Sequence, residues 1–123
     1  MYIRELIKSI QIRPLMYLQE EKIDYIYHFL AGHCGLARRY DLTAEMDKHF
    51  EIWFVKWLNN WIIENYDSMY MFKTFYWNDM LKEITSSEEE AVQLFYKLCE
   101  QFFSDYEEGA GYFAQKTTEN GKQ

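Results

Sequence analysis

The side chains of this 123-residue chain that could carry out acid–base, metal or thiol chemistry are few. Two of its three histidines, His28 and His33, are five residues apart and would lie nearly opposite each other on a helix, so they cannot bind one ion together. His33 could act as a general base or a single metal ligand, but its apolar neighbours favour a core histidine with one hydrogen bond. Cys34 and Cys99 are the only cysteines, and we predict two buried, reduced thiols rather than a disulfide.

Carboxylates that could work in pairs occur at helical spacing. Asp47 and Glu51, and likewise Asp79 and Glu83, are four residues apart and would share a helix face. Such pairs can carry out acid–base chemistry or hold a metal ion. No histidine or further acid is spaced to join them, and the chain has no glycine-rich phosphate loop, nucleophile elbow or H-E-x-x-H motif. We therefore predict solvent-facing acids, no metal site, no cofactor and no enzyme activity.

The charge of the chain indicates what kind of partner it would bind. Its formal net charge is −7 and its pI is near 4.9. Phosphate backbones are bound by clustered lysine and arginine, so we predict no direct binding to nucleic acid. An acidic surface suits a basic protein partner, because complementary fields speed the encounter. No apolar run is long enough for a membrane span and no signal peptide is visible, so we expect no membrane partner and a cytoplasmic location.

The helix that must position these side chains is predicted over Met46–Ile63. Its large apolar residues recur at spacings of three and four and gather on one face: Met46, Phe50, Trp53, Phe54, Trp57 and Trp61. Apolar residues make up 49% of the chain, and one proline and five glycines interrupt it little. We predict an all-α, single-domain bundle of about five helices around this aromatic-rich helix. Its buried side chains are expected to include Trp53, Phe54, Trp57, Phe95 and Leu98.

The two helices before it are predicted from their boundaries. The first ends near Arg13, because Pro14 disfavours the helical conformation in the residue before it. The apolar residues of 13–18 are expected to pin a turn to the core. The second helix runs from about 21 to 40, and its Gly32 and Gly35 indicate close approach by another helix.

The C-terminal half is predicted to contain a short helix and a long one. Residues 70–84 permit one continuous helix, but we favour an irregular segment followed by a short helix. The buried face of that helix would consist of Trp77, Met80, Leu81 and Ile84. Ser86 and Ser87, each followed three residues later by a glutamate, form two overlapping capping boxes that start the last helix. The helical domain is predicted over residues 1–106, with residues 107–123 as a flexible C-terminal tail.

Residues 66–83 contain aromatic side chains that the helical pattern does not place on a buried face. A protein interface needs aromatic anchors surrounded by polar or charged residues. We predict that this stretch binds the partner through its aromatic and acidic side chains: Tyr66, Asp67, Tyr70, Phe72, Phe75, Tyr76, Asp79 and Glu83. The alternative, that these aromatics fold inward over the central helix, stays open.

Five stretches of the chain carry a family resemblance: the hexapeptide Arg13-Pro-Leu-Met-Tyr-Leu18 and residues 27–32, 50–57, 77–81 and 89–95. Together they resemble small acidic bacterial proteins from toxin-immunity loci. The hexapeptide of those proteins has glycine after the proline, whereas this chain has Leu15. In size and acidity the chain is similar to immunity proteins of contact-dependent growth inhibition systems, several of which neutralise nuclease toxins in the cytoplasm.

The resemblance implies an immunity protein that binds and neutralises a cognate toxin domain, with the basic partner that the charge favours. The alternative function is a small helical interaction or regulatory module without a toxin partner. A gene for a large secreted protein next to this one would distinguish the two, since an immunity protein is encoded beside its toxin.

Overall fold

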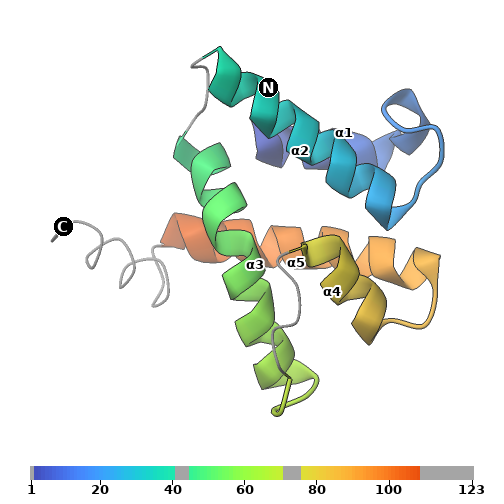
Figure 1. The fold of residues 1–123 in the computed structure, drawn as a ribbon, viewed down its shortest axis with the longest axis vertical. Coiled ribbons are helices and arrows are strands. Elements are labelled where there is room, and N and C mark those ends of the chain that lie inside the picture. The colour runs from blue at the N-terminus through green and yellow to red at the C-terminus, as the bar shows by residue number, and fades with distance from the viewer. Residues whose placement is uncertain (1, 41–44, 71–75, 109–123) are drawn as a thin grey trace, which may run out of the picture.

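The computed structural model describes residues 2–40, 45–70 and 76–108 (Figure 1). These residues form five α-helices and one short 3-10 helix, and none of them forms a strand. In chain order the elements are α1 (Ile3–Ile12), η1 (Pro14–Met16), α2 (Ile23–Arg39), α3 (Glu45–Asn65), α4 (Trp77–Ile84) and α5 (Glu88–Glu108). The predicted all-α bundle of five helices is confirmed. Because α5 continues to Glu108, the first two residues of the predicted tail, 107 and 108, are helical.

The bundle is built on the crossing of α3 and α5, which meet at a steep angle (Figure 1). Each of these two helices also contacts α1, α2 and α4. Aromatic rings fill the crossing: the ring centroids of Phe54 and Phe102 are 5.3 Å apart, and Trp77 of α4 stacks on Phe95 at 4.4 Å. The aromatic-rich helix α3 therefore has the predicted central position, and α5 shares it.

The buried face of α3 follows the predicted pattern at Phe50, Phe54 and Trp57, whereas Met46, Trp53 and Trp61 are half-buried. Phe54 and Trp57 are buried, and so are the predicted core residues of α5, Phe95 and Leu98. Trp53 was predicted to be buried but is half-buried, and the ammonium group of Lys56 lies over its ring, 5.0 Å from the centroid. The reason is that Trp53 lies at the edge of the buried stripe. The centre of this stripe consists of residues spaced by four along α3: Phe50, Phe54, Leu58 and Ile62.

Two helices receive their N-terminal caps from distant helices. The residue before α1 and the residue before α2 supply no side-chain cap. Instead, the Ile3 N–H of α1 donates to Asp47 Oδ1 of α3 at 3.0 Å, and the Ile23 N–H of α2 donates to Glu88 Oε1 of α5 at 2.6 Å. Each carboxylate satisfies a helix-end N–H and lies at the positive end of a helix dipole. These two contacts join α1 to α3 and α2 to α5.

The start of α5 is capped by its own serines, in part as predicted. The Glu90 N–H donates to Ser87 Oγ at 3.1 Å, which is one half of a capping box. The Glu90 carboxylate accepts a hydrogen bond from the hydroxyl of Ser86 at 2.7 Å, so the return contact goes to Ser86 rather than Ser87.

The glycines of α2 do not mark a helix contact, contrary to the prediction. A Cβ atom added at Gly32 would meet nothing within 4 Å, and one at Gly35 would meet only a guanidinium nitrogen of Arg38, at 3.9 Å. Gly32 therefore faces open space, and Gly35 meets only a side chain of its own helix.

The hexapeptide at 13–18 also differs from its prediction. Leu15 and Met16 are 72% and 68% exposed, because the turn of η1 directs them outward. Leu18 is buried, and Tyr17 is half-buried against the core with its ring edge to face on Phe29 at a centroid distance of 5.8 Å, so these two side chains hold the turn.

Candidate protein-binding surface

His33 and Asp47 meet between α2 and α3 in an arrangement that the sequence did not predict. Asp47 is 3% exposed, because α1 places its N-terminus on this carboxylate; the predicted solvent-facing pair of Asp47 and Glu51 is therefore wrong. His33 Nε2 lies 3.6 Å from Asp47 Oδ2, which is too far for a hydrogen bond. Since the His33 side chain is 27% exposed, it is a boundary residue and not the predicted core histidine.

Both cysteines are free and buried, as predicted. Burial, together with the charges of Glu51 and Asp47, raises the pKa of Cys34 to about 12. Burial raises the pKa of Cys99 well above its usual range. Because the thiolate is the reactive form, both groups are poor nucleophiles at neutral pH. Within residues 2–40, 45–70 and 76–108, no three His, Cys, Asp or Glu side chains are grouped as a metal site.

The first predicted partner-binding residues lie at the C-terminal end of α3. Tyr66 and Asp67 are exposed, and Asp67 Oδ1 accepts a hydrogen bond from the Met69 N–H at 2.9 Å that stabilises the turn. Tyr70 is half-buried against the core, and its pKa is raised by burial and by the charge of Glu83. Tyr70 therefore folds inward against the core, as the alternative prediction stated, whereas Tyr66 does not. Two other predicted residues lie outside the described part of the chain: Phe72 and Phe75.

The other predicted residues lie at the start of α4 and along it, and one of them is held in place by a tyrosine of α2. Tyr76 is 54% exposed, and its ring meets the ring of Tyr27 edge to face at a centroid distance of 5.8 Å. Tyr27 in turn packs edge to face on the buried Trp77 at 5.1 Å. The pKa of Tyr27 is raised by burial and by the neighbouring Tyr76 and Asp79. Tyr76 is therefore an exposed ring that packs on Tyr27, and Tyr27 also lies near the carboxylate of Asp79.

Sequence reasoning did not identify Tyr27 as part of this surface. It begins the run Tyr27–Leu30, in which aromatic and apolar residues occupy every side of the helix, so the helical period does not single it out. Its role depends on the position of α4, which no local pattern encodes.

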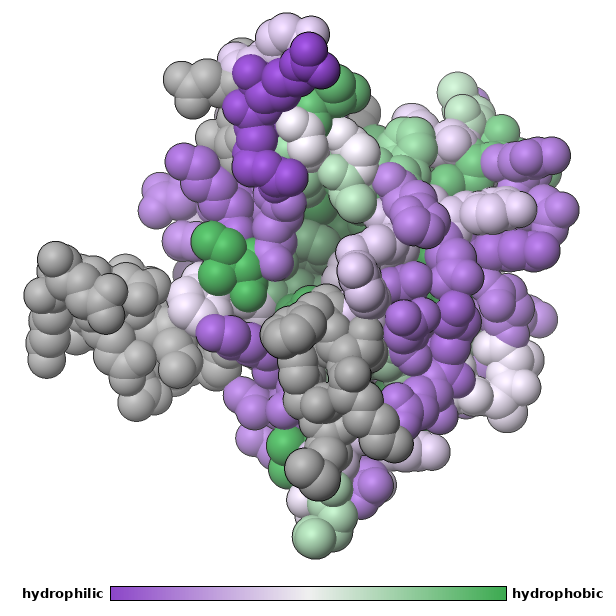
Figure 2. All heavy atoms as spheres, in the orientation of Figure 1, coloured by the Kyte–Doolittle hydropathy of each residue, from purple (hydrophilic) through white to green (hydrophobic). Residues whose placement is uncertain are grey.

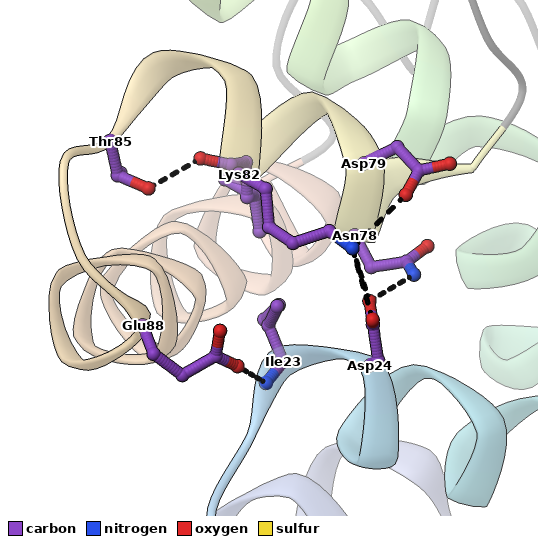
Figure 3. A network of polar contacts seen from close by, with 8 residues as sticks. Ile23, Asp24, Asn78, Asp79, Lys82, Thr85 and Glu88 are labelled. Atoms are coloured by element: carbon purple, nitrogen blue, oxygen red, sulfur yellow. Dashed lines mark hydrogen bonds and ion pairs between the residues drawn. The ribbon is translucent and has the colours of Figure 1, made fainter.

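A network of polar contacts fastens α4 to α2 beside the two tyrosines (Figure 3). Asp24 of α2 accepts hydrogen bonds from Asn78 Nδ2 at 2.8 Å and from Lys82 Nζ at 3.0 Å. The Lys82 hydrogen bond is the main reason that the pKa of Asp24 is lowered, and the Asn78 hydrogen bond is the next. Lys82 also lies 3.4 Å from Asp79 Oδ1. One lysine is thus shared by two aspartates, and Glu83 adds a further exposed carboxylate on α4.

An open apolar groove runs between α2 and α3 and is bordered by Tyr27. Its volume is about 110 Å³, and we call it the α2–α3 groove. Figure 2 shows the hydrophobic floor of this hollow between the more polar surfaces of the two helices. Arg38 of α2 pairs with Glu51 of α3 at one side of the groove. The floor and walls consist mainly of Leu30, Ala31, Cys34, Phe50, Val55 and Trp77.

Taken together, these residues form a fixed exposed ring, an adjoining apolar hollow and a net excess of carboxylates. Such a combination can bind a protein that offers a protruding apolar side chain and basic neighbours. Of the residues predicted for partner binding, Tyr76 and Asp79 belong to this surface by direct contact or close approach to Tyr27. Tyr66 and Asp67 are exposed elsewhere, at the far end of α3.

Comparisons with protein-family models, with curated proteins and with solved structures find no match for this chain. Across the helices of the described residues, none is both long and apolar enough to cross a membrane.

Proposed function

We propose that this protein binds a basic protein partner through Tyr27, Tyr76, Asp79 and the α2–α3 groove. The observation that carries the proposal is the ring of Tyr76, which is 54% exposed although it packs edge to face on Tyr27. An ordered aromatic side chain loses little conformational entropy on binding and is the residue type most often found at the energetic centre of an interface.

The charge of the molecule supports a basic partner. The net charge of the chain is −7, and the carboxylates of Asp24 on α2 and of Asp79 and Glu83 on α4 are accompanied by Lys82. An excess of negative charge beside an aromatic anchor speeds association with a positively charged protein and disfavours acidic competitors.

The physiological role that we propose is immunity. The protein would act in the cytoplasm, without catalysis, by covering a cognate toxin domain that is basic, as nucleases that bind a phosphate backbone are. The support for this role is the resemblance of residues 13–95 to proteins of toxin-immunity loci, together with the acidic, aromatic surface.

The test is co-expression with the C-terminal domain of the secreted protein encoded by the neighbouring reading frame. An immunity protein restores growth to cells that express this domain and co-purifies with it. Absence of both rescue and a complex would refute the proposed role, whereas a complex without rescue would support the alternative of an interaction module.

A further inference from the structure

A second hollow lies further along α3 than the α2–α3 groove, toward the C-terminal end of the helix. It is formed where α3 crosses α5, has a volume of about 320 Å³, and we call it the α3–α5 cleft. The residues that line the cleft include Trp57, Asn60, Trp61, Glu64, Gln101 and Asp105.

The charge of the cleft is negative and is not balanced within it. Glu64 and Asp105 line it, and none of its lining residues among those described is a lysine or an arginine. Lys56, which precedes Trp57 on α3, lies over the ring of Trp53 instead. The last turn of α3, which includes Glu64, has no basic residue, so the negative end of the helix dipole adds to the two carboxylates.

The walls of the cleft are ordered. The indole Nε1–H of Trp57 donates to Asp105 Oδ2 at 3.0 Å, which fixes this carboxylate at the crossing of the two helices. Trp61 is half-buried, so part of its indole ring is accessible, and the amides of Asn60 and Gln101 supply further oxygen acceptors. A planar cation fits such a site, because it can stack on an indole ring while its N–H groups reach carboxylate and amide oxygens.

We propose that the α3–α5 cleft is a binding site for a guanidinium group. Guanidinium is favoured over a metal ion because the described residues contain no group of three or more carboxylate, histidine or cysteine ligands. It is favoured over an ammonium group because its flat face matches the indole and its several N–H donors match acceptors on two helices. The guanidinium could belong to an arginine within a protein chain or to a free small molecule, and the chemistry of recognition is the same.

The experiment is a titration of the ¹⁵N-labelled full-length protein, followed through the indole N–H signals of Trp57 and Trp61. N-acetyl-argininamide represents an arginine within a polypeptide, and agmatine represents a free guanidinium compound. N-acetyl-citrullinamide, which has nearly the same shape without the charge, is the matched negative ligand. We expect saturable shifts of both indole signals with at least one guanidinium compound and none with the citrulline compound. The guanidinium compound that binds more tightly indicates whether the natural ligand is an arginine within a protein chain or a free small molecule.

Two substitutions and a control complete the test. Glu64→Gln and Asp105→Asn should each weaken binding by about tenfold or more, since each removes a charge-assisted contact. Asparagine at 105 retains an oxygen for the Trp57 indole, and Glu64 is exposed, so both variants should keep the parent spectrum elsewhere. Glu100→Gln removes an equal charge one residue from Gln101 but outside the cleft, and should bind like the parent. No shift, equal shifts with the citrulline compound, or equal losses in all three variants would overturn the proposal.

Discussion

Asp47 illustrates how a single residue acquires a role that its sequence context does not reveal. Its spacing from Glu51 is that of a solvent-facing acid pair, yet the carboxylate is buried and caps α1, 44 residues earlier in the chain. The lysine and histidine next to it in the sequence, Lys48 and His49, give no indication of burial. Only the packing of α1 on α3 brings an unpaired N–H to this side chain.

Replacing Asp47 by alanine should destabilise the protein by about 1–3 kcal/mol, because the buried Ile3 N–H loses its acceptor. Asp47→Asn keeps an oxygen that can accept this hydrogen bond and should have a smaller effect. Glu45→Ala, two residues earlier and exposed, serves as the control and should be close to the parent. Urea denaturation measures all three. Equal stabilities of the two alanine variants would mean that the cap does not contribute.

Asp24 should make stability depend on acid pH. Its pKa in the folded state is lowered by the hydrogen bonds from Lys82 and Asn78, so its contribution is present above the ordinary pKa of 3.8 and is lost as pH falls through the lower folded value. Asp24→Asn should therefore be less stable than the parent at pH 7, by about 0.5 kcal/mol given the exposure of the pair. The difference should vanish at the acid end of a pH series of thermal melts. A difference that grows below pH 3.8 would contradict the assignment.

The ends and the buried face of a helix could be predicted where the sequence of that helix alone determines them. Pro14 ends α1, Ser87 starts α5, and the spacing of Phe54 and Trp57 places the core face of α3. The predictions that failed concern relations between helices, such as the neighbour expected at Gly32. The hydrogen bond that caps the Ile23 N–H likewise depends on Glu88, which is 65 residues away in the first turn of α5, so no local pattern predicts it.

The role of Glu88 in joining α2 to α5 can be separated from its role within α5. Glu88 and Glu89 are both exposed acids in the first turn of α5, but only Glu88 is seen to accept the Ile23 N–H. Glu88→Ala should therefore destabilise the protein by about 1 kcal/mol more than Glu89→Ala, which removes an equal charge near the same dipole. The comparison uses the free energy of unfolding in urea. If the two variants match, the cap between helices contributes nothing.

At the scale of the whole molecule, composition and helical spacing were enough to predict the class of fold, but the sequence indicated only part of the proposed binding surface. Tyr76 and Asp79 were identified because the helical pattern does not place them on the buried face. Tyr27 and the α2–α3 groove were missed, since a hollow between two helices exists only after both are positioned. Tyr66 was grouped with Tyr76 because they are near in sequence, whereas the fold places Tyr66 just after the end of α3 and Tyr76 just before the start of α4.

The acids beside Tyr76 should act on the rate of association more than on the lifetime of the complex. Asp79→Asn combined with Glu83→Gln should slow association with a basic partner several-fold at low salt, and the difference should shrink as salt is added. Glu89→Gln combined with Glu108→Gln changes the net charge equally on α5 and should have a smaller effect. Stopped-flow measurements over a salt series provide the test, and a larger effect of the α5 pair would place the partner on another face.

The most direct test of the account is the dissociation constant of the proposed complex with a basic toxin domain, measured for the parent, Tyr76→Ala and Tyr25→Ala. Tyr25 is an exposed tyrosine of α2 that points roughly opposite Tyr27, so its loss should leave binding near the parent value. Loss of the Tyr76 ring should weaken binding by about 2 kcal/mol, or roughly thirtyfold, with an unchanged melting temperature. A Tyr76→Ala protein that binds as tightly as the Tyr25→Ala protein would contradict the account.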